Sequence, residues 1–214
     1  MRQTTRILGM VAMITVTAYG STSQAAFFGY PRALKFQLER MTFETPALAP
    51  LAHTRFCMQY PADCEPESVD FRRRNIELTQ ERWDELNAIN REVNRDIKPE
   101  LNQGGVLAER WQIAPKAGEC HDYAVTKRHE LLERGWPARS LLLSEVIVAD
   151  GEHHLVLVVR MKNLDLVLDN LSANIRTVAM TNYHWVRAEL PSNPKYWSTV
   201  NVPSHLPRTA MLDD

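Results

Sequence analysis

The spacing of hydrophobic residues predicts a long helix in the first half of the chain. Apolar side chains recur at helical intervals from Trp83 to Ile97, and Pro99 stops the pattern. Thr79 lies just before this run and is a favourable residue for the start of a helix. The pattern therefore predicts a helix that begins after Thr79 and ends before Pro99.

A second helix is predicted to begin at or beside Cys120. Ala124 and Leu131 share one face with this cysteine, and the pattern continues to Arg134. Gly135 then supplies a typical stop for the helix.

Beyond this helix the hydrophobic period changes to that of β-strands. Residues 141–148 form the first predicted strand, and Asp150-Gly151 is a strong hairpin signal. Residues 154–161 are apolar on both faces, which predicts a central strand, and residues 164–169 form a third. The aromatic tail is expected to add another strand. The predicted fold class is α+β, with a helix packed on an antiparallel sheet.

The register of the last hairpin decides which histidine faces Asp169. If residues 162–163 form a two-residue turn, Val156 lies opposite Asp169 and His154 lies one diagonal step away. His153 would then point to the other face of the sheet. A turn one residue longer or shorter would exchange the two histidines, so the register alone leaves the choice open.

The N-terminus has the pattern of a secretory signal. Two arginines precede an apolar run of about 13 residues, and Ser23-Gln24-Ala25 offers a cleavage site of small residues, with residues 18–20 as the alternative. The run is shorter than the roughly 20 residues of a membrane-spanning helix. We therefore expect a signal peptide over residues 1–25 and a periplasmic or secreted protein that is not inserted in a membrane after processing.

Composition indicates a single globular domain after processing. The chain of 214 residues is 44% hydrophobic and has a formal net charge of −1. This charge argues against nucleic acid as a partner. Residues 26–51 contain three prolines and no strong period, so we expect a loosely structured N-terminal arm, followed by one domain over residues 52–214.

The three cysteines divide into a pair and a single residue. Cys57 and Cys64 are close in the sequence, and an oxidising compartment favours a disulfide between them. Cys120 is then left as a candidate reactive thiol. The alternative is that Cys120 is a small buried hydrophobic residue.

The position of Cys120 favours nucleophilic chemistry. A thiol reacts as the thiolate, and the free N–H groups at a helix N-terminus lower its pKa. Gly118 would let a substrate backbone approach closely. A nucleophilic cysteine also needs a base within hydrogen-bond reach and a third group that orients the base. The strands that carry the histidines and Asp169 can supply both.

These segments resemble the bacterial transglutaminase-like cysteine proteinases. The resemblance lies in Gly118-Glu119-Cys120-His121-Asp122-Tyr123-Ala124, in His154-Leu155-Val156-Leu157 and in Val167-Leu168-Asp169-Asn170-Leu171, which occur in the family's order and at its intervals. It covers about residues 57–197. The resemblance implies a papain-like fold of transglutaminase type and a cysteine peptidase activity. The implied catalytic triad is Cys120, His154 and Asp169, and the choice of His154 rests on the resemblance.

The resemblance also implies a substrate class and a metal. The best-understood members, of the LapG type, are periplasmic proteases that clip large surface adhesins, so the implied partner is a protein substrate. They use calcium held by carboxylates that flank the nucleophile in a Gly-Asp-Cys-Glu-Asp pattern. Here Glu119 and Asp122 are the candidate calcium ligands, and His121 replaces the glutamate of that pattern. Imidazole is a poor ligand for calcium.

Three other functions remain open at this stage. A thiol acyltransferase or amidase would use the same triad, because an amine can resolve an acyl-enzyme instead of water. A binding domain could keep the fold without catalysis. A metal site made of Cys120, His121, His153 and His154 lacks the usual zinc spacing.

Overall fold

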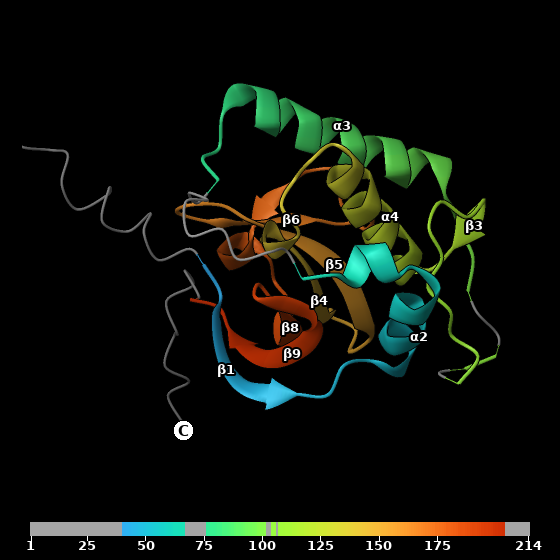
Figure 1. Ribbon diagram of the computed structural model, residues 1–214. Coiled ribbons are helices and arrows are strands. Elements are labelled where there is room, and N and C mark those ends of the chain that lie inside the picture. Colours follow the sequence, from blue (N-terminus) through green and yellow to red (C-terminus); the bar gives the residue numbers. More distant parts are fainter. Residues whose placement is uncertain (1–39, 67–75, 102–103, 106, 204–214) are drawn as a thin grey trace, which may run out of the picture.

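The computed structural model describes residues 40–66, 76–101, 104, 105 and 107–203. The expected signal peptide and residues 26–39 of the expected arm lie outside these ranges. In the described part, three α-helices pack on a seven-stranded antiparallel sheet (Figure 1), which confirms the predicted α+β class. No helix within the described ranges is long and apolar enough to cross a membrane.

The two predicted helices are present with the predicted ends. Helix α3 (Gln80–Asp96) begins after Thr79, whose hydroxyl accepts the backbone N–H of Arg82. Helix α4 (Cys120–Glu133) has Cys120 as its first residue. It stops before Gly135, which has a φ of +80° and so adopts the left-handed conformation that ends many helices.

The sheet has the strand order β1-β9-β8-β4-β5-β6-β7, and every neighbouring pair is antiparallel. Its strands are β1 (Thr42–Ala47), β4 (Leu141–Ile147), β5 (His153–Arg160), β6 (Asp165–Leu168), β7 (Arg176–Thr177), β8 (His184–Leu190) and β9 (Asn193–Asn201). The tail thus supplies two paired strands, β8 and β9. Strand β5 lies between β4 and β6, as its apolar faces predict.

The predicted register of the β5–β6 hairpin is confirmed. Arg160 pairs with Asp165 and Leu157 pairs with Leu168, so that the continuation of this ladder places Val156 opposite Asp169. The backbone N–H of Met161 donates to the carbonyl of Leu164 at 2.9 Å and closes the turn.

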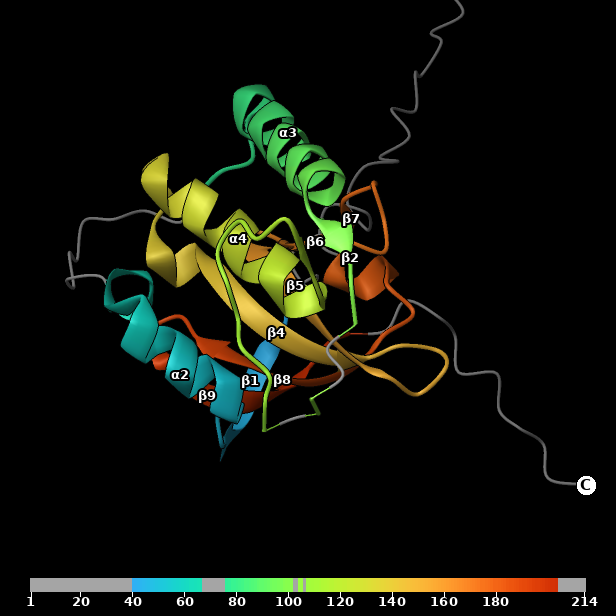
Figure 2. The ribbon, with the colours of Figure 1, turned by 90° about the vertical axis from the view of Figure 1, so that its right-hand side faces the viewer.

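The alternation of side chains along the central strands divides the core into two parts. On one face of the sheet, residues such as Leu143, Leu157 and Leu168 join the apolar residues of the three helices in the main core. On the other face, residues such as Val158 and Val167 form a second buried cluster. Helix α4 packs on β5, and α3 lies outside α4 (Figure 2). Helix α4 is therefore enclosed between α3 and the sheet.

Two elements differ from the expectation for the N-terminal part. The arm is not loosely structured where it is described, because β1 pairs with β9 as an edge strand of the sheet. Cys57 lies in helix α2 (Leu51–Gln59), and Cys64 ends the short helix η2 (Pro61–Cys64), two elements that the sequence pattern did not predict. Pro46 lies where the β1–β9 register shifts, which is a position that tolerates proline.

A short parallel bridge fixes the segment before Cys120. Strands β2 (Lys98–Pro99) and β3 (Ala117–Gly118) pair, and the N–H of Glu100 donates to the carbonyl of Gly118 at 3.0 Å. This bridge joins the end of α3 to the start of α4.

Candidate active site

The start of α4 is held by a capping box around Cys120. Glu119 is the N-cap, and its backbone N–H donates to Asp122 Oδ2 at 2.9 Å. The other carboxylate oxygen, Asp122 Oδ1, accepts the N–H of Gln112 at 2.8 Å. Both oxygens of Asp122 thus fix the turn that carries Cys120.

The structure gives a reason for a glycine at position 118 that the sequence did not reveal. A Cβ atom built at this position would lie 2.2 Å from Asp122 Oδ2 and 2.8 Å from its Cγ. Any side chain there would displace the carboxylate that caps the helix. Gly118 is therefore required for close packing against Asp122. Its expected role in letting a substrate backbone approach stays a prediction.

His154 and Asp169 form a buried pair at the ends of adjacent strands. His154 Nε2 lies 2.9 Å from Asp169 Oδ1, and the two side chains are 6% and 3% exposed. Asp169 Oδ1 also accepts the N–H of Leu171, and the hydroxyl of Tyr183 donates to Oδ2. Since Nε2 faces the aspartate, Nδ1 is the nitrogen of His154 that remains for the thiol.

The structure separates the two histidines that the sequence left as alternatives. His153 is 65% exposed, and its Nδ1 lies 2.6 Å from Glu145 Oε1. His154 is buried beside Asp169 and Cys120. Because His153 is paired elsewhere, the four residues of the alternative metal site do not converge.

The pKa values of the three residues favour a thiolate–imidazolium pair. Burial raises the pKa of the Cys120 thiol, but hydrogen bonds with His121 and His154 outweigh this and lower it to about 7. Burial lowers the pKa of His154, but hydrogen bonds with Asp169 and Cys120 raise it to about 9. Burial also raises the pKa of Asp169, and the bonds from His154 and Tyr183 bring it below its usual value.

His121 is a second imidazole beside the thiol, and its partners were not foreseen. Its ring stacks on Trp111 at a centroid distance of 5.9 Å, and its Nδ1 lies 3.4 Å from Glu109 Oε1. Its Nε2 lies 3.4 Å from Asp122 Oδ2 and 3.9 Å from Glu119 Oε2. Glu109 comes from the irregular segment before α4, where sequence periodicity carries no signal.

Tyr183 and Lys127 are two further groups near the pair that the sequence did not assign to it. Tyr183 lies in the segment before β8, far from Asp169 in sequence, and no local pattern links the two. Lys127 lies on α4 and is 1% exposed. Burial lowers the pKa of Lys127 to about 7, although the charge of Asp169 acts in the opposite direction.

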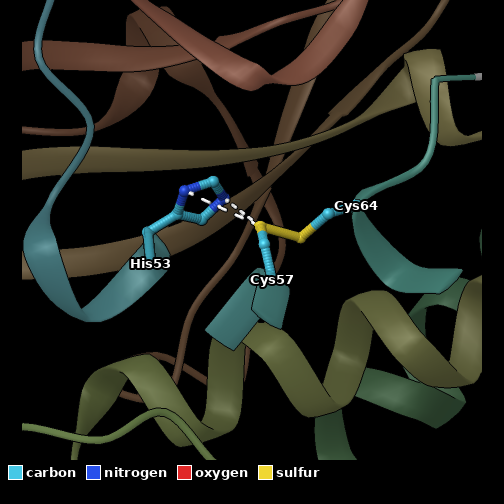
Figure 3. A group of neighbouring side chains, drawn as sticks. All are labelled: His53, Cys57 and Cys64. Carbon is cyan, nitrogen blue, oxygen red and sulfur yellow. Dashed lines mark hydrogen bonds between the residues drawn. A yellow bond between two sulfur atoms is a disulfide. The ribbon is translucent and has the colours of Figure 1, made fainter. Parts of the chain in front are cut away.

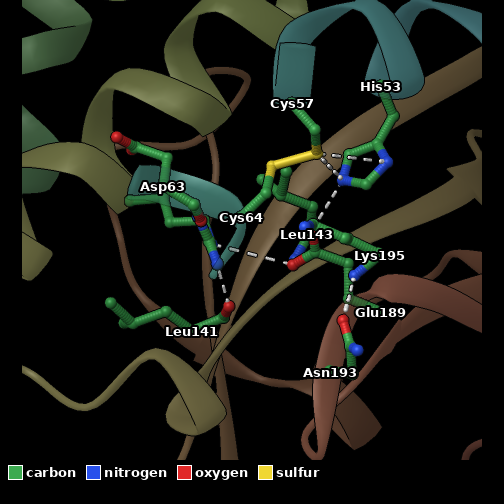
Figure 4. Close-up of a disulfide and its surroundings, with 10 residues drawn as sticks. His53, Cys57, Asp63, Cys64, Leu141, Leu143, Glu189, Asn193 and Lys195 are labelled. Atoms are coloured by element: carbon green, nitrogen blue, oxygen red, sulfur yellow. Dashed lines mark hydrogen bonds and ion pairs between the residues drawn. A yellow bond between two sulfur atoms is a disulfide. The ribbon is translucent and has the colours of Figure 1, made fainter. Parts of the chain in front are cut away.

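The predicted disulfide between Cys57 and Cys64 is present in the structure. His53 lies against it, with Nε2 3.5 Å from Cys57 Sγ (Figure 3). The same nitrogen lies 2.9 Å from Glu189 Oε1. Glu189 also approaches Arg128 of α4, whose Nε lies 3.7 Å from Glu189 Oε2. Figure 4 shows Glu189 and His53 beside the disulfide. The disulfide thus belongs to a buried polar network that reaches the nucleophile helix away from Cys120.

A cavity of about 360 Å³ lies beside the nucleophile turn. Its wall includes Glu100, Arg110, Gly118, Glu119 and His121. The cavity gives a ligand access to the turn that precedes Cys120, and charged groups line it.

Calcium, which the family resemblance implies, does not fit the acidic residues at this turn. Both oxygens of Asp122 already accept backbone N–H groups, and the imidazole of His121 lies among the carboxylates. Within the described ranges, the cluster of three side chains close enough together to bind one metal ion consists of His53, Cys57 and Cys64. The two sulfurs of this cluster are joined as a disulfide. Glu119 and Asp122 are therefore helix-capping residues in this structure.

A cysteine at a helix N-terminus beside a buried histidine–aspartate pair is the arrangement of a thiol hydrolase or acyltransferase. Residues 43–205 match the family model of the bacterial transglutaminase-like cysteine proteinases. The match covers most of the chain, and the protein belongs to this family. No curated protein matches the chain.

Solved structures of one bacterial protein are similar to this fold. Calcium-bound Legionella pneumophila LapG is 21% identical over 58% of this chain and 73% of that chain, with a TM-score of 0.48. A second structure of Legionella pneumophila LapG is 20% identical, with a TM-score of 0.43. That alignment covers 50% of this chain and 62% of the LapG chain, so the match spans less than two thirds of that relative.

Proposed function

We propose that this protein is an exported cysteine peptidase that hydrolyses peptide bonds through Cys120, His154 and Asp169. The observation that carries the proposal is the buried His154–Asp169 contact of 2.9 Å, next to a thiol at the first residue of a helix. Membership in a family of cysteine proteinases supports the same reaction.

In the first step, the Cys120 thiolate attacks the carbonyl carbon of the substrate, and the carbonyl oxygen becomes an oxyanion. The backbone N–H of Cys120 can donate to this oxyanion, because the first N–H groups of a helix have no carbonyl partner within it. His154 Nδ1–H then gives its proton to the leaving amine, and the peptide C–N bond breaks. An acyl-enzyme thioester remains on Cys120.

In the second step, neutral His154 takes a proton from water, and the resulting hydroxide attacks the thioester. The C–S bond breaks, the acid leaves, and the thiolate–imidazolium pair is restored. Asp169 keeps Nε2 of His154 protonated throughout and so directs Nδ1 to the sulfur. Tyr183 holds Asp169 in place by donating to its second oxygen.

The proposed substrate is a periplasmic or surface protein, with a surface adhesin as the candidate. The signal-like N-terminus and the Cys57–Cys64 disulfide support an oxidising compartment outside the cytoplasm. The alternative reaction is acyl transfer or amide hydrolysis by the same triad, in which an amine competes with water for the thioester.

The test combines the chemistry of the thiol with turnover. Alkylation of the purified mature protein with iodoacetamide across a pH series, read by mass spectrometry, should label Cys120 with a pKa near 7. His154→Ala should return this pKa toward the 8.5 or so of a free thiol, a loss of about tenfold or more in reactivity at pH 6.

Turnover is then measured on a library of unstructured peptides, with added amine nucleophiles to detect transfer. Cys120→Ala should abolish cleavage, whereas Cys57→Ser with Cys64→Ser serves as a matched control that removes the disulfide sulfurs outside the site. Cleavage that survives Cys120→Ala would exclude the proposed mechanism. If the parent protein binds peptides of the library but cleaves none of them, the result would favour a non-catalytic binding domain.

A further inference from the structure

The strongest unexplained feature of the molecule is the set of acidic groups around His121. Each of its two ring nitrogens faces a carboxylate, with Nδ1 at 3.4 Å from Glu109 and Nε2 at 3.4 Å from Asp122. A neutral imidazole has one N–H and one lone pair, so that one of these nitrogens would direct a lone pair at a carboxylate oxygen. Only the imidazolium form is complementary to both partners.

The surroundings hold this ring in one place. His121 is 7% exposed, and its face stacks on Trp111, whose indole N–H donates to the same Glu109 oxygen at 2.7 Å. A third carboxylate, Glu119, approaches Nε2 at 3.9 Å. Glu100 and the competing cation Arg110 line the cavity beside it.

The ring is also adjacent to the nucleophile. His121 directly follows Cys120 in α4, so a positive charge on its ring lies close to the thiol and favours the thiolate. A fixed positive charge close to the sulfur stabilises a thiolate, as a bound metal ion would. The start of α4 therefore brings together the cationic ring of His121, three carboxylates and the proposed nucleophile.

We propose that His121 is a built-in cation beside Cys120, so that the nucleophile is assembled and activated without calcium. The role of Cys120 as the nucleophile in this inference rests on the proposed function. The independence of the protein from calcium rests instead on the contacts of His121 with the carboxylates. His121 is a positioning residue: it acts through the thiol and through the carboxylates at the start of α4, and His154 remains the base.

The first test measures calcium binding without using activity. Thermal unfolding and titration calorimetry of the mature protein are compared in excess calcium and in a calcium chelator. We expect the same unfolding midpoint in both and no binding heat. A calcium-dependent rise in the midpoint, or a saturable heat, would overturn the inference even if the peptidase reaction is correct.

The second test asks whether the charge of His121 matters to the thiol. In His121→Gln, which keeps a polar side chain without the charge, alkylation of Cys120 at pH 6 should slow by about tenfold, which corresponds to about one unit of pKa. In His121→Lys, which restores a cation, the rate should recover at least in part. His129→Gln on the same helix is the matched control and should leave the rate unchanged, because His129 pairs with Asp63 instead.

Circular dichroism of each variant separates loss of charge from loss of fold. An unchanged alkylation profile in folded His121→Gln would overturn the inference. If Cys120 of the parent protein has its lowered pKa but the protein cleaves no peptide, the result would contradict the proposed function and still support the role of His121.

Discussion

At the residue scale, Cys120 lies between two imidazoles whose environments differ. His154 has one nitrogen on Asp169 and the other free for the thiol, so it can give and take a proton during a reaction. His121 has both nitrogens on carboxylates, which fixes its charge. Burial lowers the pKa of His121, but hydrogen bonds with Asp122 and Cys120 raise it to about 10. One imidazole can therefore act as the base while the other stays charged.

The reaction should consequently have a pH window set by Cys120 and His154. The thiol pKa is lowered to about 7, so the thiolate is lost as the pH falls through that value. The His154 pKa is raised to about 9, so the proton needed by the leaving amine is lost as the pH rises through that value. We expect a bell-shaped profile of kcat/KM with its plateau between about pH 7 and pH 9.

Initial rates on a peptide substrate over pH 5 to 10.5 would measure this window, with unfolding followed at each pH as a control. A profile that rises continuously to pH 10 would mean that His154 does not protonate the leaving group. In Asp169→Asn the alkaline limb should move to lower pH, because the imidazolium has lost its charged partner.

The sequence predicted the positions of the proposed triad better than their supporting contacts. The helical pattern from Cys120 to the stop at Gly135 and the turn at residues 162–163 are local signals. They place Cys120 near a helix start and bring residues 153–154 close to Asp169, whereas the choice of His154 came from the family resemblance. Tyr183 and Glu109 reach the site from segments without regular structure. Such long-range contacts depend on the tertiary fold, and no spacing rule in one sequence indicates them.

At the element scale, α4 is fixed at two places by different means. Its N-terminus is fixed by the capping box and by the β2–β3 bridge. Its middle is fixed through η2, where Arg128 donates to the carbonyl of Asp63 and His129 Nδ1 lies 3.1 Å from the Asp63 carboxylate. The Cys57–Cys64 bond holds η2 against α2. The disulfide therefore supports the part of the helix that lies away from Cys120.

Removing the disulfide should lower stability and leave the thiol chemistry in place. For a loop of this size we expect Cys57→Ser with Cys64→Ser to lower the free energy of unfolding by about 2–3 kcal/mol. The pKa of Cys120 should change little, since Arg128 and His129 lie about two turns from it. Urea unfolding and iodoacetamide alkylation measure the two effects separately, with Cys120→Ser as the control for unfolding. If Cys120 has the pKa of a free thiol in a variant that still folds, the disulfide would be needed to support the active site.

Helix α2 and strand β1 show what sequence periodicity could not reveal. Helix α2 has nine residues and begins after Pro50 without a side-chain cap, so its start carries no capping signal. Strand β1 is largely exposed along its length and contains Pro46. Both are stabilised by contacts with the rest of the molecule, which a local pattern does not contain.

At the scale of the whole molecule, the first and last described strands close one edge of the sheet. Strand β1 pairs with β9, and the N–H of Met41 donates to Asp165 Oδ2 at 2.9 Å. Asp165 is fully buried and also pairs with Arg160. The N-terminal segment therefore completes both the sheet edge and a buried ion pair.

Deletion of residues 26–47 from the mature protein should weaken the whole fold. Loss of Met41, which is 2% exposed, removes about 2 kcal/mol of apolar burial, and Asp165 loses a buried donor. The bare edge of β9 should also promote self-association. Urea unfolding and size-exclusion chromatography measure these effects, with Glu44→Ala on the exposed side of β1 as the control. A deletion protein as stable and monomeric as the parent would show that β1 is dispensable.

The short separation of Cys57 and Cys64 has a consequence for the oxidative folding of the chain. These cysteines are 7 residues apart, whereas a bond from Cys64 to Cys120 would close a loop about eight times as long. The entropy of loop closure in an unfolded chain favours the shorter ring by about 1.8 kcal/mol, or roughly twentyfold in probability. When the chain is oxidised, the two structural thiols capture each other first. We therefore expect the third thiol to remain reduced and available for the site.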